Sequence, residues 1–199
     1  MFHRNTALRL TVPTAVLALA LTACGGGDSK SDSSSEGKPK DDAAASQPKE
    51  EKLAAGASTT GKVDEDGTAI TYDVAAQKVD LGTEADAKKL VQDPEDAKGL
   101  VPAVAHLKFT HKGGAALTAS PDVADTTEIW ADGTRGGLLI GAAEDAPGCE
   151  DPLDLEGWKK GESHVLCETY LVPQAAKDLE VHWAEKEDGK PAIWSLPAK

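Results

Sequence analysis

Hydrophobic and polar residues alternate along most of the chain beyond residue 63. In Val101–Thr110, every second residue from Val101 to Phe109 is apolar and points one way, while His106, Lys108 and Thr110 point the other way. Alternation with a period of two predicts a β-strand with one buried face. The same reasoning predicts further strands at Ala69–Val74, Gln77–Leu81, Thr126–Trp130, Gly137–Ile140, His164–Val172, Leu179–Ala184 and Ala192–Leu196.

Turn-forming pairs such as Asp66-Gly67, Asp132-Gly133 and Asp188-Gly189 separate these predicted strands. The exception to the period of two is Glu84–Gln92, where the apolar positions predict a short helix before Asp93-Pro94. About eight short strands without βαβ spacing favour an all-β fold. We therefore expect residues 63–199 to form one antiparallel, immunoglobulin-like β-sandwich with a short helix.

The beginning of the chain has the pattern of an export signal. Arg4 and Arg9 precede the apolar stretch Leu10–Leu21, which is shorter than the ~20 residues of a membrane-spanning helix. The stretch ends in Leu21-Thr22-Ala23-Cys24, and this order is typical of a lipoprotein processing site. We expect residues 1–23 to be a cleaved signal peptide and Cys24 to carry a diacylglycerol that anchors the protein at the outer, extracellular face of the cell membrane. The alternative is an ordinary secretory signal followed by an unrelated cysteine.

Residues 24–62 are small, polar or charged, with few large apolar side chains. Such a composition buries too little surface to offset the entropy of ordering, and it predicts a disordered linker after the lipidated Cys24. The whole chain has a formal net charge of −13. Because nucleic acids repel a polyanion, the charge argues against nucleic-acid binding.

Only Cys149 and Cys167 remain once Cys24 is lipidated. An even pair of cysteines in an exported domain predicts a disulfide. Closing a loop of this length stabilises a fold by about 3 kcal/mol in the chain-entropy model. A metal or redox pair is the alternative, but the sequence has no CxxC motif and no regular histidine spacing.

The sequence contains no recognisable catalytic constellation. A zinc site requires three or four converging ligands, and His106, His111, His164 and His182 form no local cluster, so we expect them to be solvated surface residues. We expect no cofactor, no metal and no enzymatic activity. Two acidic segments leave calcium binding open as an alternative, namely the turn Asp64–Gly67 and the group Asp145, Glu150, Asp151 and Asp154.

Tryptophan is over-represented among the aromatic residues, with four tryptophans against two tyrosines and two phenylalanines. Trp183 and Trp194 lie at alternating positions of predicted strands, which favours a place in the core. Trp158 lies in a predicted loop beside Gly157 and Lys159. Trp158 is therefore a candidate for a rim contact with a partner.

Several short motifs resemble a known group of domains. They include Gly99-Leu100-Val101-Pro102 before a long strand, Trp158–Ser163 as a turn, Tyr170-Leu171-Val172-Pro173 at a strand end, and Leu179–Trp183. Together they are similar to the immunoglobulin-like (telokin-like) domains of unknown function in many Gram-positive cell-surface lipoproteins. The resemblance covers most of Thr68–Leu196 and implies a sandwich fold with a surface role, but no reaction. The Cys149/Cys167 pair and the long acidic loop depart from the pattern of that group.

These observations together predict a membrane-anchored extracellular lipoprotein that acts as a non-catalytic binding module of the cell envelope. Its expected partners are the membrane, through the lipid anchor, and an unidentified envelope protein or cell-wall polymer. The alternative is a ligand-sensing or solute-binding accessory lipoprotein, with or without calcium dependence.

Overall fold

The computed structural model describes residues 52–143, 146–155 and 157–197. The chain divides into two units, residues 1–45 and 46–199, and all the described residues belong to the second. The predicted signal peptide 1–23, Cys24 and most of the predicted linker lie outside the described residues.

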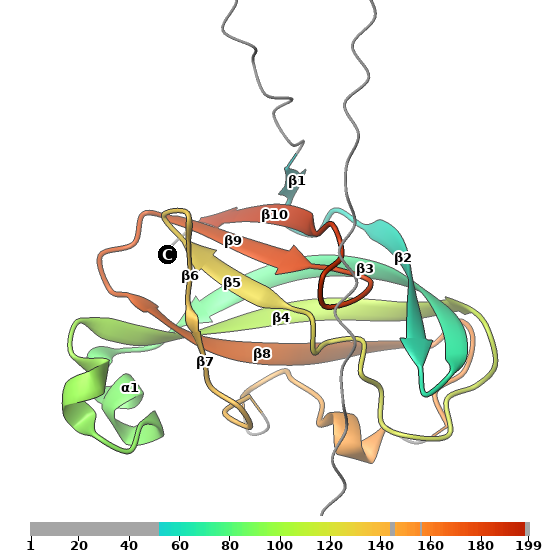
Figure 1. The fold of residues 1–199 in the computed structure, drawn as a ribbon, viewed down its shortest axis with the longest axis horizontal. Helices are drawn as coiled ribbons and strands as arrows, with labels where there is room; N and C mark the ends of the chain where they lie inside the picture. Colours follow the sequence, from blue (N-terminus) through green and yellow to red (C-terminus); the bar gives the residue numbers. More distant parts are fainter. Residues whose placement is uncertain (1–51, 144–145, 156, 198–199) are drawn as a thin grey trace, which may run out of the picture. The chain divides into compact units, whose positions relative to one another are not determined.

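Two five-stranded sheets pack face to face (Figure 1). Every strand pairing is antiparallel except that of β1 with β10. An all-β sandwich is therefore confirmed. The first sheet has the order β1 (Leu53–Ala54), β10 (Ala192–Pro197), β9 (Asp178–Trp183), β5 (Glu128–Ala131), β6 (Thr134–Arg135). The second has the order β2 (Thr59–Glu65), β3 (Thr68–Leu81), β4 (Leu100–Gly113), β8 (Ser163–Pro173), β7 (Gly137–Leu138).

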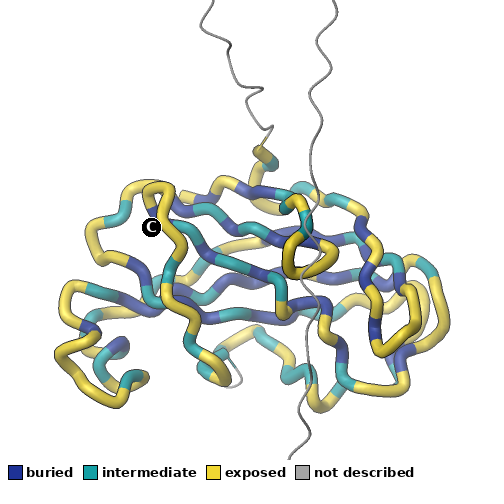
Figure 2. The backbone as a smooth tube through the Cα atoms, viewed as in Figure 1, coloured by how far each residue is buried: buried dark blue, intermediate teal, exposed yellow. Residues whose placement is uncertain are grey.

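The core lies between the two sheets and follows the predicted alternation. From Val101 to Phe109 in β4, every second side chain is at most 3% exposed. Trp183 and Trp194 are also in the core, as predicted. Figure 2 shows the buried stretches running along the strands while exposed residues gather in the turns.

The structure corrects two predicted boundaries. The strands predicted at Ala69–Val74 and Gln77–Leu81 are one continuous strand, β3, whose register shifts between Ala76 and Lys78. The shift interrupts the alternation, because Ala75 and Ala76 are both buried. The predicted linker end at residue 62 falls inside β2, and β1 also precedes it. β2 is an edge strand with little apolar sequence, since its buried positions are Gly61, Val63 and Glu65.

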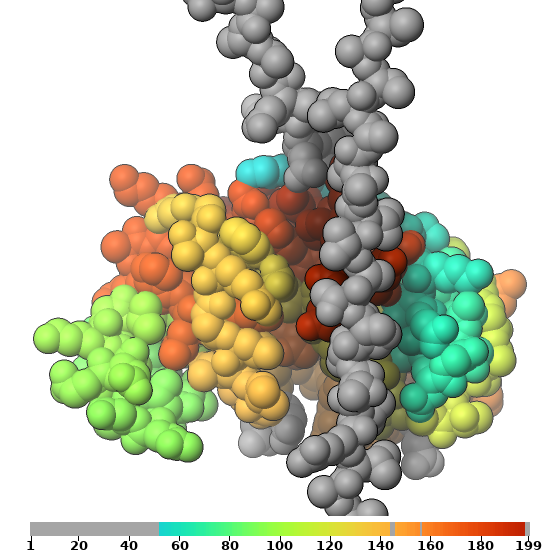
Figure 3. Space-filling view, viewed as in Figure 1, coloured from blue at the N-terminus to red at the C-terminus, as the bar shows by residue number. Residues whose placement is uncertain are grey.

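The predicted short helix is present as α1 (Glu84–Leu90). Thr83 and Asp86 form a capping box at its start, in which each side chain bonds to the backbone N–H of the other. This pairing satisfies two N–H groups that a helix start leaves open. Two short 3₁₀ turns lie elsewhere, η1 (Pro94–Ala97) and η2 (Pro152–Asp154). Figure 3 shows the segment around α1 as a lobe at one end of the domain.

One edge of the second sheet is covered by an irregular segment. Beyond the short β7, Leu139 N donates to Thr169 O at 2.8 Å, and Glu150 N donates to Val165 O at 2.9 Å. The Glu150 carboxylate also accepts from Val165 N at 2.9 Å. The predicted Cys149–Cys167 disulfide is present and joins this segment to β8. These contacts occupy backbone groups that an open strand edge would offer to another chain.

Candidate functional site

A groove of about 480 Å³ opens beside β2 and β5. Six carboxylates and two basic side chains line it, which leaves a formal excess of four negative charges. Leu138, which is 42% exposed, and Val63, at 8%, add apolar surface. The lining residues are Val63, Asp64, Asp122, Asp125, Thr126, Glu128, Arg135, Leu138, Glu185, Lys186 and Glu187.

The segment before β5 that carries Asp122 and Asp125 is fixed by its hydrogen bonds. Glu65, 4% exposed, accepts from Asp122 N at 2.7 Å and from the Tyr72 hydroxyl at 2.9 Å. Trp183 Nε1 donates to the Val123 carbonyl at 2.7 Å. At the other end of the segment, the Tyr170 hydroxyl donates to the Thr127 carbonyl at 2.8 Å. Because buried groups hold both ends, the acidic wall is preorganised rather than formed on binding.

Arg135 is partly neutralised within the groove. Its Nε lies 2.9 Å from Glu128 Oε1, and its guanidinium lies 5.9 Å from the centre of the Tyr170 ring. Glu128 also accepts from Trp130 Nε1 at 2.8 Å. With one carboxylate committed to Arg135, the remaining acidic groups determine the sign of the field in the groove.

Burial perturbs the acidic groups on this side of the domain. Burial raises the pKa of Asp125, and the negative charge of Asp122 adds to the effect. Burial also raises the pKa of Glu65, against the opposing hydrogen bonds from the Asp122 backbone and Tyr72. The pKa of Glu168 is raised to about 7, first by burial and then by the charge of Asp125. Of these three carboxyls only Asp125 lines the groove, and its raised pKa means that it loses its negative charge at a higher pH than an unperturbed aspartate would.

The carboxylates do not converge as calcium ligands would. A protein calcium site uses six to eight oxygen ligands at about 2.3–2.6 Å from the ion. Within the part of the chain that the structure describes, no three carboxylates bring their oxygens within 4.8 Å of one another. The groove is therefore better suited to a larger organic cation than to a coordinated metal ion.

The acidic residues that the sequence singled out have other contacts. Asp64 accepts from Gly67 N at 2.6 Å and so closes the β2–β3 turn. Glu150 binds Val165 N and His164 Nδ1, and Asp151 accepts from Leu153 N at the start of η2. Asp154 is exposed, and Asp145 lies outside the described residues.

The prediction that Trp158 contacts a partner is wrong, because Trp158 is buried. The side chain is 1% exposed and packs against Tyr72 at 5.2 Å and His164 at 4.8 Å between ring centres. The loop folds back over the end of the sheet, where the Trp158 carbonyl accepts from Leu117 N at 2.9 Å. Trp130 is the least buried of the four tryptophans, and it stacks on His182 with ring centres 5.0 Å apart.

The prediction that the histidines are solvated is wrong for two of them. His111 is fully buried and its Nε2 lies 2.9 Å from the Ala115 carbonyl, while His106 is 2% exposed. His164 and His182 are partly exposed. His106 projects from the outer face of β4, as its alternation predicted, but the segment carrying Cys149 covers that face.

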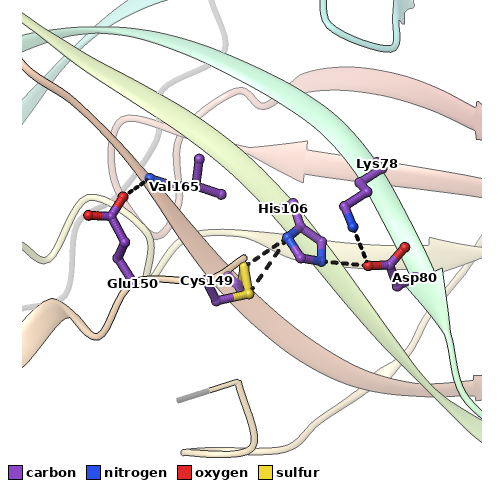
Figure 4. The surroundings of a disulfide bond; sticks show 7 residues. Lys78, Asp80, His106, Cys149, Glu150 and Val165 are labelled. Carbon is purple, nitrogen blue, oxygen red and sulfur yellow. Dashed lines mark hydrogen bonds and ion pairs between the residues drawn. A yellow bond between two sulfur atoms is a disulfide. The ribbon is translucent and has the colours of Figure 1, made fainter. Parts of the chain in front are cut away.

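His106 brings the disulfide and β3 together (Figure 4). Its Nδ1 lies 3.3 Å from Cys167 Sγ and 3.6 Å from Cys149 Sγ, and its Nε2 lies 2.9 Å from Asp80 Oδ2. Burial lowers the pKa of His106, with the charge of Lys78 acting in the same direction and that of Asp80 against it. The sequence showed no signal for this cluster, because its members are far apart along the chain.

Among the described residues, no helix is both long and apolar enough to cross a membrane. No family model and no curated protein matches the chain. Among solved structures, a "putative lipoprotein" from Staphylococcus aureus subsp. aureus NCTC 8325 is similar, with a TM-score of 0.46 and 9% sequence identity. The likeness covers 70% of this chain and 93% of that chain.

Proposed function

We propose that this protein is a lipid-anchored, non-catalytic binding module at the outer face of the cell membrane. In this proposal Cys24 carries the anchor, the sandwich is immunoglobulin-like, and the acidic groove binds a cationic segment of an envelope protein. We infer a positively charged partner because the preorganised groove has four more carboxylates than basic side chains. The Leu21–Cys24 pattern supports the anchor.

The lining of the groove favours a polypeptide partner over a simple ion. Lysine and arginine combine an apolar stem with a cationic head, and they cover apolar surface while the charge stays in a polar setting. Leu138 and Val63 offer such a surface beside Asp64 and Asp125. The surrounding negative field would also steer a cationic partner towards the groove.

The test compares two variants with equal changes in charge. Asp125→Asn/Glu187→Gln removes two charges from the groove, and Glu95→Gln/Asp96→Asn removes two exposed charges at η1. Two lost charge pairs at about 0.5–1 kcal/mol each predict roughly five- to thirtyfold weaker binding of a hexalysine probe to the groove variant. Equal weakening by both variants would show a general charge effect and reject the groove.

The cellular arm of the test uses surface crosslinking of the anchored protein on intact cells. We expect an envelope protein that is captured by the wild type and by the η1 variant, but not by the groove variant. Cys24→Ala tests the anchor separately by moving the protein from the membrane fraction to the medium. Retention of Cys24→Ala in the membrane fraction would reject lipidation at this residue.

A further inference from the structure

His106, Cys149 and Cys167 form the one group of three histidine, cysteine or acidic side chains in the described residues that could hold a metal ion. Their ligand atoms all lie within 4.8 Å of one another. The three come from separate parts of the fold, namely β4, the segment after β7, and β8. Strand pairing places His106 directly opposite Cys167, and the hydrogen bonds between Glu150 and Val165 hold the segment of Cys149 beside them in addition to the disulfide.

The distances fit a tetrahedral centre. With Zn–S at about 2.3 Å and Zn–N at about 2.0–2.1 Å, tetrahedral angles place sulfur and nitrogen about 3.5 Å apart and two sulfurs about 3.8 Å apart. The observed separations of His106 Nδ1 from Cys167 Sγ and Cys149 Sγ are 3.3 and 3.6 Å. The two N–S separations are thus already near the required values. Only the sulfurs must move apart, and reduction of the bond releases them.

Asp80 supplies the outer contact that a metal-binding imidazole needs. A histidine ligand almost always donates its other N–H to a carboxylate, carbonyl or water, which orients the ring and fixes its tautomer. Asp80 Oδ2 lies 2.9 Å from His106 Nε2, on the opposite side of the ring from the sulfurs. Lys78 binds the same carboxylate oxygen and holds it in place.

We propose that reduction of the Cys149–Cys167 disulfide opens a zinc-binding site made of the two thiolates and His106 Nδ1, with Asp80 as the positioning residue. A dithiol reductant donates two electrons and two protons to the disulfide and becomes a disulfide itself. Zn²⁺ then displaces the two thiol protons to solvent. Three protein ligands leave a fourth position for water or an external ligand.

The test measures zinc binding by the purified chain in its oxidised form and after reduction by a phosphine. Competition with a chromophoric chelator reports affinity and stoichiometry. We expect one Zn²⁺ per reduced chain and no matching site in the oxidised chain. His106→Gln should bind at least tenfold more weakly, and Asp80→Asn should lose about 10–100-fold.

His182→Gln is the matched control, because that imidazole also contacts a carboxylate, Glu180, at 3.0 Å but lies on the other sheet. It should bind zinc as the wild type does. Wild-type affinity in His106→Gln would overturn the site, and so would equal affinity in the reduced wild type and Cys149→Ser/Cys167→Ser.

A second measurement covers the case in which reduction or substitution loosens the fold. A metal that binds the native arrangement raises the melting temperature of the reduced chain by mass action, even from a largely unfolded population. We expect Zn²⁺ to raise the melting temperature of the reduced chain and to leave that of the oxidised chain unchanged. The absence of a rise in the reduced chain would also overturn the proposal.

Discussion

Glu168 is an acidic residue on the core side of a strand, and replacing it by glutamine should stabilise the protein at alkaline pH. In β8, Glu168 is paired with Ala105, which is fully buried on the core face of β4. Directly opposed residues of an antiparallel pair point to the same face. The carboxyl therefore points into the space between the sheets, where burial and the charge of Asp125 raise its pKa to about 7.

The sign and size of the effect follow from this shift. The folded state holds the proton more tightly than the unfolded chain, so the stability contributed by Glu168 is present below pH 4.5 and is lost as the pH rises through about 7. The full shift would correspond to about 3 kcal/mol at alkaline pH. Because the side chain is only partly buried, solvent screening reduces this to roughly 1–2 kcal/mol. Glu168→Gln removes the cost of the charge, so it should stabilise the fold by this amount at pH 8 and by little at pH 5.

Urea unfolding followed by tryptophan fluorescence measures this free energy at both pH values. Glu187→Gln is the control, because it removes the same charge from an exposed position. Its effect on the free energy of unfolding should be small and nearly independent of pH. An equal difference between pH 5 and pH 8 in the two variants, or a loss of stability by Glu168→Gln at pH 8, would refute the reasoning.

Three further predictions concern stability. Cys149→Ser/Cys167→Ser should lower the free energy of unfolding by about 3 kcal/mol, because it frees a loop with a sequence separation of 18, and denaturant titration measures the loss. Gly61→Ala should lower it by about 1–3 kcal/mol, because the new Cβ would lie 2.5 Å from Trp183 Cη2; unchanged stability would mean that Trp183 yields freely. Trp158→Ala should cost about 3–5 kcal/mol by opening a cavity, whereas a rim contact would cost little, and thermal unfolding distinguishes the two.

The strands were predictable because they are long, alternate regularly, and have one face in the core. Val101–Thr110 shows this best, since every second position from Val101 to Phe109 is apolar and buried in the core. The alternation failed where it was interrupted or weak. The register shift in β3 made this one strand look like two separate strands in the sequence. β2 was not predicted, because two of its inward positions, Gly61 and Glu65, are not apolar side chains.

The functional features were harder to predict because alternation shows which way a side chain points, but not what lies there. His106 was expected to point away from the core and does so, yet it is buried by a segment that begins more than thirty residues later. Trp158 lies in a loop, as expected, but the loop folds back and buries it. The groove joins residues of β2, β5 and the β9–β10 turn, and no local pattern connects these three.

The proposed zinc site would hold in place the same segment, around Cys149 and Glu150, that covers the edge of β8. In the oxidised protein, the bond between Cys149 and Cys167 holds the covering segment against β8, with the Glu150 contacts to Val165 beside it. Reduction alone would leave those hydrogen bonds to keep the edge closed. A Zn²⁺ ion bound by both thiolates would again link the segment to β8, and His106 would extend the link to β4. We therefore expect backbone amides near Val165 to exchange faster with solvent after reduction and to slow again on addition of Zn²⁺, whereas amides in β9 should not respond. Exchange near Val165 that stays fast in the zinc-loaded chain would show that the ion does not replace the disulfide as a clamp on this edge.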